Sequence, residues 1–212
     1  MVKETLCFCN AQKYTAILLS AAEITTCGPS TQNTCSTSGG HAFDQIIPLA
    51  SASVTSSSRT KHMPYQVFIN HCGQDVKETL ASRIYNSLEG TGVRVFLDKT
   101  ELNHGDFFPL AIEAAMRSAS FHIAIFSEHY AQSPWCLAEL AFMIEIGETI
   151  VPVFYHVEPF DLRWAIKGKG KYADALSEHE SKGRIASEEL HRWKMALHRV
   201  SFCHGYIIKN TE

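Results

Sequence analysis

The segments Phe121–Phe126 (FHIAIF) and Ser133–Gly147 (SPWCLAELAFMIEIG) decide the fold class. The first is short and almost wholly apolar, which is typical of a buried strand in a parallel sheet. The second predicts a helix, because Ser133 is a favoured N-cap residue and Pro134 is tolerated in the first turn. A buried strand followed by a capped helix is the repeating unit of α/β folds.

The same alternation of strand and helix continues on both sides of this unit. Apolar and β-branched segments predict further strands at Tyr65–Asn70, Val93–Leu97 and Thr149–Tyr155. Apolar residues at helical spacing predict helices at Asp75–Glu89, Phe108–Ser118 and Ser187–Phe202. We therefore expect a flavodoxin-like three-layer α/β sandwich, with helices on both faces of a central parallel sheet. Ligands of such sheets bind beyond the carboxyl ends of the strands.

Residues 1–60 differ in composition from the remainder of the chain. They are rich in Ser and Thr, including the run Ser56–Ser58, and they carry few charges and little periodicity. Such a segment lacks the apolar surface needed for a core of its own. We expect a poorly ordered N-terminal extension over residues 1–60 and a folded domain over residues 61–208.

Hydropathy excludes a membrane-spanning protein, and charge argues against a dedicated nucleic-acid binder. The chain has 19 Lys and Arg against 22 Asp and Glu, a net charge of −3, whereas nucleic-acid binders normally carry a basic excess. No apolar run approaches the ~20 residues of a membrane-spanning helix. The sequence therefore predicts neither a nucleic-acid nor a membrane partner.

The seven cysteines do not form the pattern of a disulfide framework. Four lie within the first 35 residues and the other three are isolated, at Cys72, Cys136 and Cys203. A small secreted scaffold would have denser and more regular spacing, and zinc sites have paired CxxC motifs, which are absent here. We expect free thiols in a reducing compartment, and hence a cytoplasmic protein.

Two further sequence patterns are weak evidence for a ligand site, one for a dinucleotide and one for a metal ion. Gly168–Ala173 (GKGKYA) matches a loose dinucleotide-binding pattern, but it comes late in the chain instead of directly after the first strand. We interpret it as a mobile, solvated basic loop. His198, Cys203 and His204 lie close in sequence without an evident fourth ligand, so we predict no metal site.

Glu139 is the residue that best fits a chemical role. Trp135, Glu139 and Met143 are spaced four residues apart and so share one stripe of the predicted helix. Glu139 lies just past the first turn, beyond the carboxyl end of the strand Phe121–Phe126. A carboxylate among Leu and Ala side chains would be partly desolvated, which is an environment typical of functional sites.

Four motifs in order make residues from Tyr65 to about Tyr206 resemble a plant Toll/interleukin-1 receptor (TIR) domain. The first strand with Gly73-Gln74-Asp75 resembles the opening motif of that family. The other three are Phe96–Gly105, which resembles the BB loop, Ile125–Leu140 with its Trp-Cys-Leu-Ala-Glu-Leu run, and Pro152–Pro159 (PVFYHVEP). Because the chain ends soon after this domain, it is similar to TIR-only proteins.

The resemblance implies an enzyme that cleaves NAD+ as its substrate and needs no cofactor. Many plant TIR domains release ADP-ribose or cyclic ADP-ribose isomers in immune and cell-death signalling. The helical Glu of the Trp-Cys-Leu-x-Glu-Leu motif is catalytic in that family, and by position it is Glu139 here. The alternative is a non-catalytic adaptor that acts by homotypic TIR–TIR association.

The resemblance also implies further site residues and self-association. The expected substrate-binding residues are Cys72, Gly73, Thr100, Ser133 and Trp135, although Trp135 fits a packing role equally well. The expected assembly contacts of the BB loop are Asp98, Lys99, Glu101, Leu102 and Gly105. Family members act as assemblies, so we expect self-association, contacts with other TIR proteins, and activity that rises steeply with protein concentration.

One position departs from the family pattern. Plant members usually have Arg before the glycine of the first loop, and this chain has Cys72 there. An Arg would pair with phosphate or ribose oxygens. Its replacement affects phosphate binding and the choice between NAD+ and NADP+, and it leaves Glu139 in place.

Overall fold

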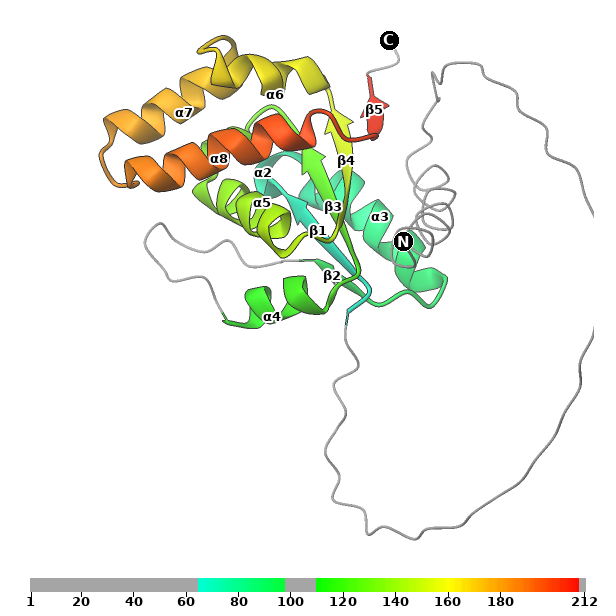
Figure 1. Ribbon diagram of the computed structural model, residues 1–212. Helices are drawn as coiled ribbons and strands as arrows, with labels where there is room; N and C mark the ends of the chain where they lie inside the picture. Colours follow the sequence, from blue (N-terminus) through cyan, green and yellow to red (C-terminus); the bar gives the residue numbers. More distant parts are fainter. Residues whose placement is uncertain (1–64, 98–109, 210–212) are drawn as a thin grey trace, which may run out of the picture. The chain divides into compact units, whose positions relative to one another are not determined.

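The computed structural model describes residues 65–97 and 110–209 (Figure 1). The first half contains β1 (Val67–His71), α2 (Gly73–Val76), a π-helical segment (Lys77–Ala81), α3 (Ser82–Gly90), β2 (Val95–Leu97), α4 (Leu110–Ser118) and β3 (Phe121–Phe126). The second half contains a 3₁₀ turn (Tyr130–Gln132), α5 (Pro134–Ile146), β4 (Thr149–Tyr155), α6 (Pro159–Ile166), α7 (Lys171–Ser181), α8 (Ser187–Val200) and β5 (Tyr206–Ile208).

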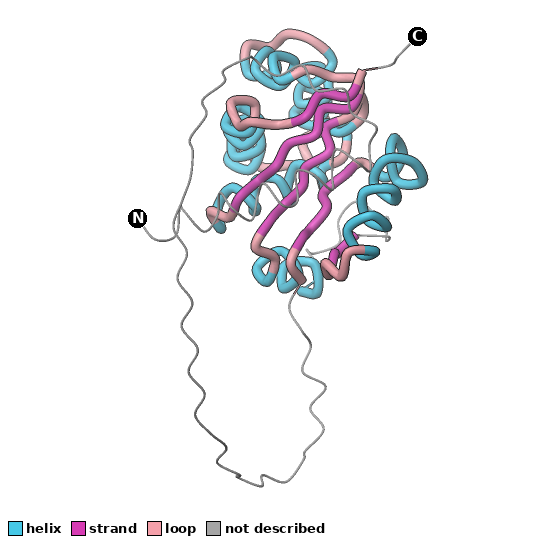
Figure 2. The backbone as a smooth tube through the Cα atoms, turned by 90° about the vertical axis from the view of Figure 1, so that its right-hand side faces the viewer, coloured by secondary structure: helices cyan, strands magenta, loops and turns pink. Residues whose placement is uncertain are grey.

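The five strands form one parallel sheet in the order β2-β1-β3-β4-β5 (Figure 2). This is the strand order of flavodoxin-like folds, in which the order reverses between the first and third strands. β1 pairs with β3 over the full length of β1, from Val67 opposite Phe121 to His71 opposite Ile125. The predicted flavodoxin-like sandwich is confirmed.

Alternation along the strands divides the core into two layers. Val67, Ile69 and Ile123 pack with the buried residues of α2, the π-helical segment and α3, including Leu80 and Ile84. The residues between them in β1 and β3 point to the other face, because successive strand side chains alternate. That face includes Phe68, Ala124 and Phe126, packed with buried residues of α4, α5, α7 and α8. Helices therefore cover both faces of the sheet, as predicted.

The predicted strand and helix positions hold with small shifts. Phe121–Phe126 and Thr149–Tyr155 have the predicted bounds. Ser133 is the N-cap of α5, and its Oγ accepts a hydrogen bond from the Cys136 N–H at 3.3 Å. Gly147 ends the helix in a left-handed conformation with φ 74°, which glycine adopts without strain.

The sequence patterns did not predict α6, α7, β5 or the short 3₁₀ turn at Tyr130–Gln132. α6 begins at a capping box in which Glu158 N–H donates to the Asp161 carboxylate at 2.8 Å. The prediction of a solvated loop at Gly168–Ala173 is wrong in its second half. Gly168 and Gly170 form an exposed turn, but Lys171 begins α7 and Tyr172 is buried, with its hydroxyl donating to the Ser127 carbonyl at 2.7 Å.

None of the helices in the described ranges is both long and apolar enough to cross a membrane. The predicted extension over residues 1–60 lies outside the described residues, so that prediction stays open. The same holds for the start of the helix predicted at Phe108, whose described part begins at Leu110.

Candidate functional site

The site lies where the strand order reverses, between β1 and β3. After β1 the chain enters α2 on one face of the sheet, and after β3 it enters α5 on the opposite face. The segments that follow these two adjacent strands therefore lie on opposite faces of the sheet. In open α/β sheets this divergence is the point at which ligands bind.

Glu139 reaches this point from α5. Its Oε2 accepts a hydrogen bond from Asn70 Nδ2 at 2.7 Å, so the carboxylate meets the carboxyl end of β1. Only 6% of Glu139 is exposed, and Asn70 is fully buried. The Glu139 carboxylate is therefore buried and lies beside the carboxyl end of β1, as expected for a desolvated carboxylate.

Tyr130, in the 3₁₀ turn after β3, holds the other end of Asn70. Its hydroxyl donates to Asn70 Oδ1 and lies 3.1 Å from the Cys136 carbonyl oxygen. Burial raises the pKa of Tyr130 well above its ordinary value, and Cys136 and Glu139 act in the same direction. Tyr130 therefore keeps its proton and acts as a donor.

Cys72 and Gly73 connect β1 to α2. Cys72 is buried and is the single residue between the end of β1 and the start of α2. A hydrogen bond from the Cys136 thiol lowers the pKa of Cys72, against the effect of burial. Cys136 keeps its proton, because that hydrogen bond and burial raise its pKa well above the ordinary value. Cys72 thus belongs to the core beside Cys136.

Ser133 and Trp135 lie at the start of α5. Ser133 caps the helix, and Trp135 is half-buried in the first turn. Both residues are within two turns of Glu139 on the same helix. Thr100 and the expected assembly residues Asp98, Lys99, Glu101, Leu102 and Gly105 lie outside the described residues, so those predictions stay open.

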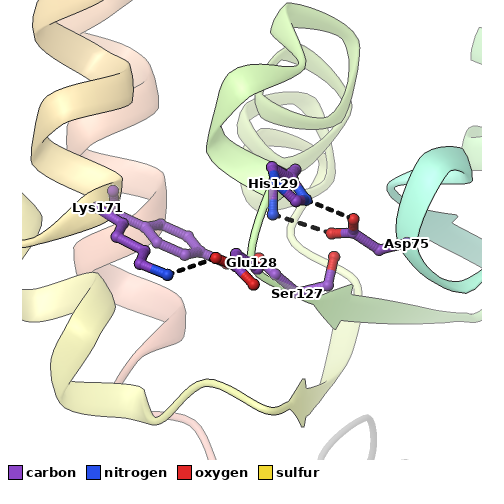
Figure 3. A network of polar contacts seen from close by, with 6 residues as sticks. Asp75, Ser127, Glu128, His129 and Lys171 are labelled. Atoms are coloured by element: carbon purple, nitrogen blue, oxygen red, sulfur yellow. Dashed lines mark hydrogen bonds and ion pairs between the residues drawn. The ribbon is translucent and has the colours of Figure 1, made fainter.

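A polar bridge between Asp75 and His129 crosses the same switch point (Figure 3). The backbone N–H of His129 donates to Asp75 Oδ2 at 2.9 Å, and its Nδ1 lies 2.7 Å from Oδ1. The bridge joins the start of α2 to the turn after β3. Beside it, Lys171 of α7 forms an exposed ion pair with Glu128.

The bridge favours the charged forms of both partners. Burial acts to raise the pKa of Asp75, but the nearby Ser127 hydroxyl and the hydrogen bonds from His129 outweigh it and lower the pKa. The Asp75 carboxylate in turn raises the pKa of His129. Because the side chain of His129 is 34% exposed, solvent screens this pair and it acts mainly as an orienting contact.

Sequence reasoning missed the partners of Glu139. Asn70 is a polar residue at the end of an otherwise apolar strand, and that exception was the available signal. Tyr130 and His129 follow β3 without any spacing that relates them to Asn70 or Asp75.

Within the described part of the chain, no group of three His, Cys, Asp or Glu side chains is arranged to hold a metal ion.

Comparison with known proteins identifies the family. The family model for the TIR domain matches residues 64–212, and this chain therefore belongs to the TIR domain family. The TIR domains of the activated Roq1 resistosome share the fold, with a TM-score of 0.59 and 32% identity over 69% of this chain and 89% of that one.

Two curated relatives come from plants. The TMV resistance protein N of Nicotiana glutinosa is 34% identical over 156 residues, which are 72% of this chain and 13% of that protein. The probable 2' cyclic ADP-D-ribose synthase BdTIR of Brachypodium distachyon is 43% identical over 98 residues, 46% of this chain and 44% of that protein. The matched region spans less than half the length of either relative.

Proposed function

We propose that this chain cleaves the bond between nicotinamide and ribose in NAD+, with Glu139 as the catalytic carboxylate. The observation that carries the proposal is the buried Glu139 carboxylate, held by Asn70 at the switch point of the sheet. A relative named as a probable 2' cyclic ADP-D-ribose synthase supports the choice of substrate. The plant resistance relatives support a role in immune signalling, which we place in the cytoplasm.

The chemistry requires little more than one well-placed carboxylate. Nicotinamide leaves NAD+ as a neutral molecule, so the leaving group needs little protonation. Cleavage produces an oxocarbenium-like ribose, as in glycoside hydrolysis. Glu139 would stabilise that positive charge and orient the ribose hydroxyls. Capture by water gives ADP-ribose, and capture by a hydroxyl of the distal ribose gives a cyclic isomer.

Neighbouring residues complete the proposed site. Ser133 and Trp135 would contact the substrate from the start of α5, and Gly73 from the start of α2. Cys72 would act through packing beside Cys136, since it is buried. Thr100 would contact the substrate, and the BB-loop residues Asp98, Lys99, Glu101, Leu102 and Gly105 would form the assembly contacts.

The test is nicotinamide release from NAD+ by the full chain at high protein concentration. Glu139→Gln and Glu139→Ala should lose at least about 100-fold in rate, because the charge that stabilises the transition state is gone. Glu145→Gln is the matched control, since Glu145 lies on the same helix but is half exposed and paired with Arg192. Activity retained in both Glu139 variants would overturn the assignment of the carboxylate.

The product masses separate hydrolysis from cyclisation, and a concentration series tests assembly. We expect the specific activity to rise steeply with protein concentration. Specific activity independent of concentration would overturn the assembly proposal alone. A folded, self-associated wild-type chain without any nicotinamide release would favour the adaptor function.

A further inference from the structure

Three buried side chains from three separate elements form a continuous chain of hydrogen bonds to Glu139. Tyr130 donates to Asn70 Oδ1, and Asn70 Nδ2 donates to Glu139 Oε2 at 2.7 Å. Tyr130 follows β3, Asn70 lies on β1 and Glu139 lies on α5. Tyr130 and Asn70 are both fully buried, so neither exchanges its partner for water.

The Tyr130 hydroxyl and the Glu139 carboxylate favour the same orientation of the Asn70 amide. A side-chain amide can rotate by 180°, which exchanges its acceptor oxygen and its donor nitrogen. The hydroxyl of Tyr130 keeps its proton, and its two acceptors are Asn70 Oδ1 and the Cys136 carbonyl oxygen. With Oδ1 facing Tyr130, Nδ2 faces the Glu139 carboxylate, which can only accept. The reversed amide would place Oδ1 against the carboxylate, which is a repulsive contact between two acceptors.

We propose that Asn70 and Tyr130 are positioning residues that orient the Glu139 carboxylate for cleavage of NAD+. This inference rests on the proposed function, and it adds two residues outside the predicted site. Asn70 holds the carboxylate directly, and Tyr130 holds Asn70. A carboxylate released from Asn70 would rotate about its terminal bond and sample orientations that do not face the reacting ribose. Misplacement of about 1 Å is enough for losses near 100-fold.

The chain offers a matched control for the loss of a buried tyrosine hydroxyl. Tyr172 is also buried in the same core cluster, and its hydroxyl donates to the Ser127 carbonyl at 2.7 Å. Its hydroxyl contacts neither Asn70 nor Glu139 in the described hydrogen bonds. Tyr130→Phe and Tyr172→Phe therefore remove the same group from similar surroundings, and only the first interrupts the chain to Glu139.

The kinetic experiment compares the full-length wild type with Tyr130→Phe, Tyr172→Phe and Asn70→Ala at one protein concentration. We expect Tyr130→Phe to lower kcat by about 10- to 100-fold, with KM changed less than about threefold. Tyr172→Phe should lower Tm by a similar amount and keep the wild-type kcat. Equal kcat values for the two tyrosine variants would overturn the proposal.

A second readout does not depend on activity. In protein labelled with 15N-asparagine, the Asn70 side-chain amide is assigned by its loss in Asn70→Ala. We expect one downfield-shifted proton, hydrogen-bonded to Glu139, which moves upfield in Tyr130→Phe and stays in Tyr172→Phe. An unchanged signal in Tyr130→Phe would overturn the positioning. A wild type that releases no nicotinamide would instead overturn the proposed function, while the amide signal decides the positioning separately.

Discussion

His122 makes the stability of the domain sensitive to acid. It is fully buried in β3, its Nε2–H donates to the Met116 carbonyl oxygen at 3.0 Å, and its ring lies 6.0 Å from that of Phe68. Among the described residues, its Nδ1 has no hydrogen-bond partner. Protonation would place an unpaired positive charge in the core, so burial lowers the pKa of His122 from 6.5 to about 4.

The sign and size of the effect follow from the two titrations. The unfolded chain binds this proton near pH 6.5, and the folded chain binds it only near pH 4. Above about pH 7 both states are neutral, so the contribution of His122 to stability is complete. As the pH falls from 7, the free energy of unfolding decreases relative to its value at pH 7, by about 2 kcal/mol at pH 5 and about 3 kcal/mol at pH 4.

The assay is urea denaturation of the wild type and His122→Gln between pH 7.5 and 4. Glutamine can still donate to the Met116 carbonyl but does not titrate, so we expect the variant to lose about 2 kcal/mol less than the wild type between pH 7.5 and 5. The comparison removes the contributions of the other histidines. Parallel pH profiles for the two proteins would refute the reasoning.

Other single changes test other contacts. Asp75→Asn should lower the pKa of His129 toward its ordinary value in an NMR titration, because the carboxylate that raises this pKa is removed. In the wild type, the pair stabilises the fold below pH 6.5, and this contribution is lost as the pH rises through the raised pKa of His129. An unchanged His129 midpoint in the variant would contradict the bridge. Ser133→Ala should lower the free energy of unfolding by about 1 kcal/mol through loss of the α5 N-cap, and no change in denaturation would count against that cap. Gly205→Ala should cost about 1–3 kcal/mol, because its Cβ would lie 2.4 Å from a backbone carbonyl oxygen of β4. Gly90→Ala meets no atom within 4 Å and should change stability by less than about 1 kcal/mol, so equal losses at the two glycines would remove the steric explanation.

The fold was predictable where local signals agree with burial. Phe121–Phe126 is buried throughout, so its apolar run alone marks the strand. Ser133 and Gly147 mark the ends of α5 through their capping geometry. By contrast, α7 is mostly polar and is positioned by a few buried residues, such as Tyr172. β5 is only three residues long and, among the described strands, pairs only with β4, so tertiary pairing defines it more than its composition.

The candidate site was predictable only in part. Glu139 stands out because a carboxylate lies between Leu137, Ala138 and Leu140 in an apolar stretch of α5, and the family resemblance assigns it a role. Asn70 is 69 residues from Glu139 and 60 residues from Tyr130 in sequence, so no spacing relates them. Their contact arises because β1 and β3 pair in register. Cys72 stands where the family pattern has Arg, and that difference alone did not predict that its side chain would be buried beside Cys136.

The most direct test of the central claim is the ratio of initial nicotinamide-release rates between the wild type and Glu139→Gln, at equal protein and NAD+ concentrations. Glu145→Gln, run alongside, controls for the loss of one carboxylate from α5. The account predicts a ratio of at least about 100 for Glu139→Gln and close to one for Glu145→Gln. A folded Glu139→Gln variant within about threefold of the wild-type rate would contradict it.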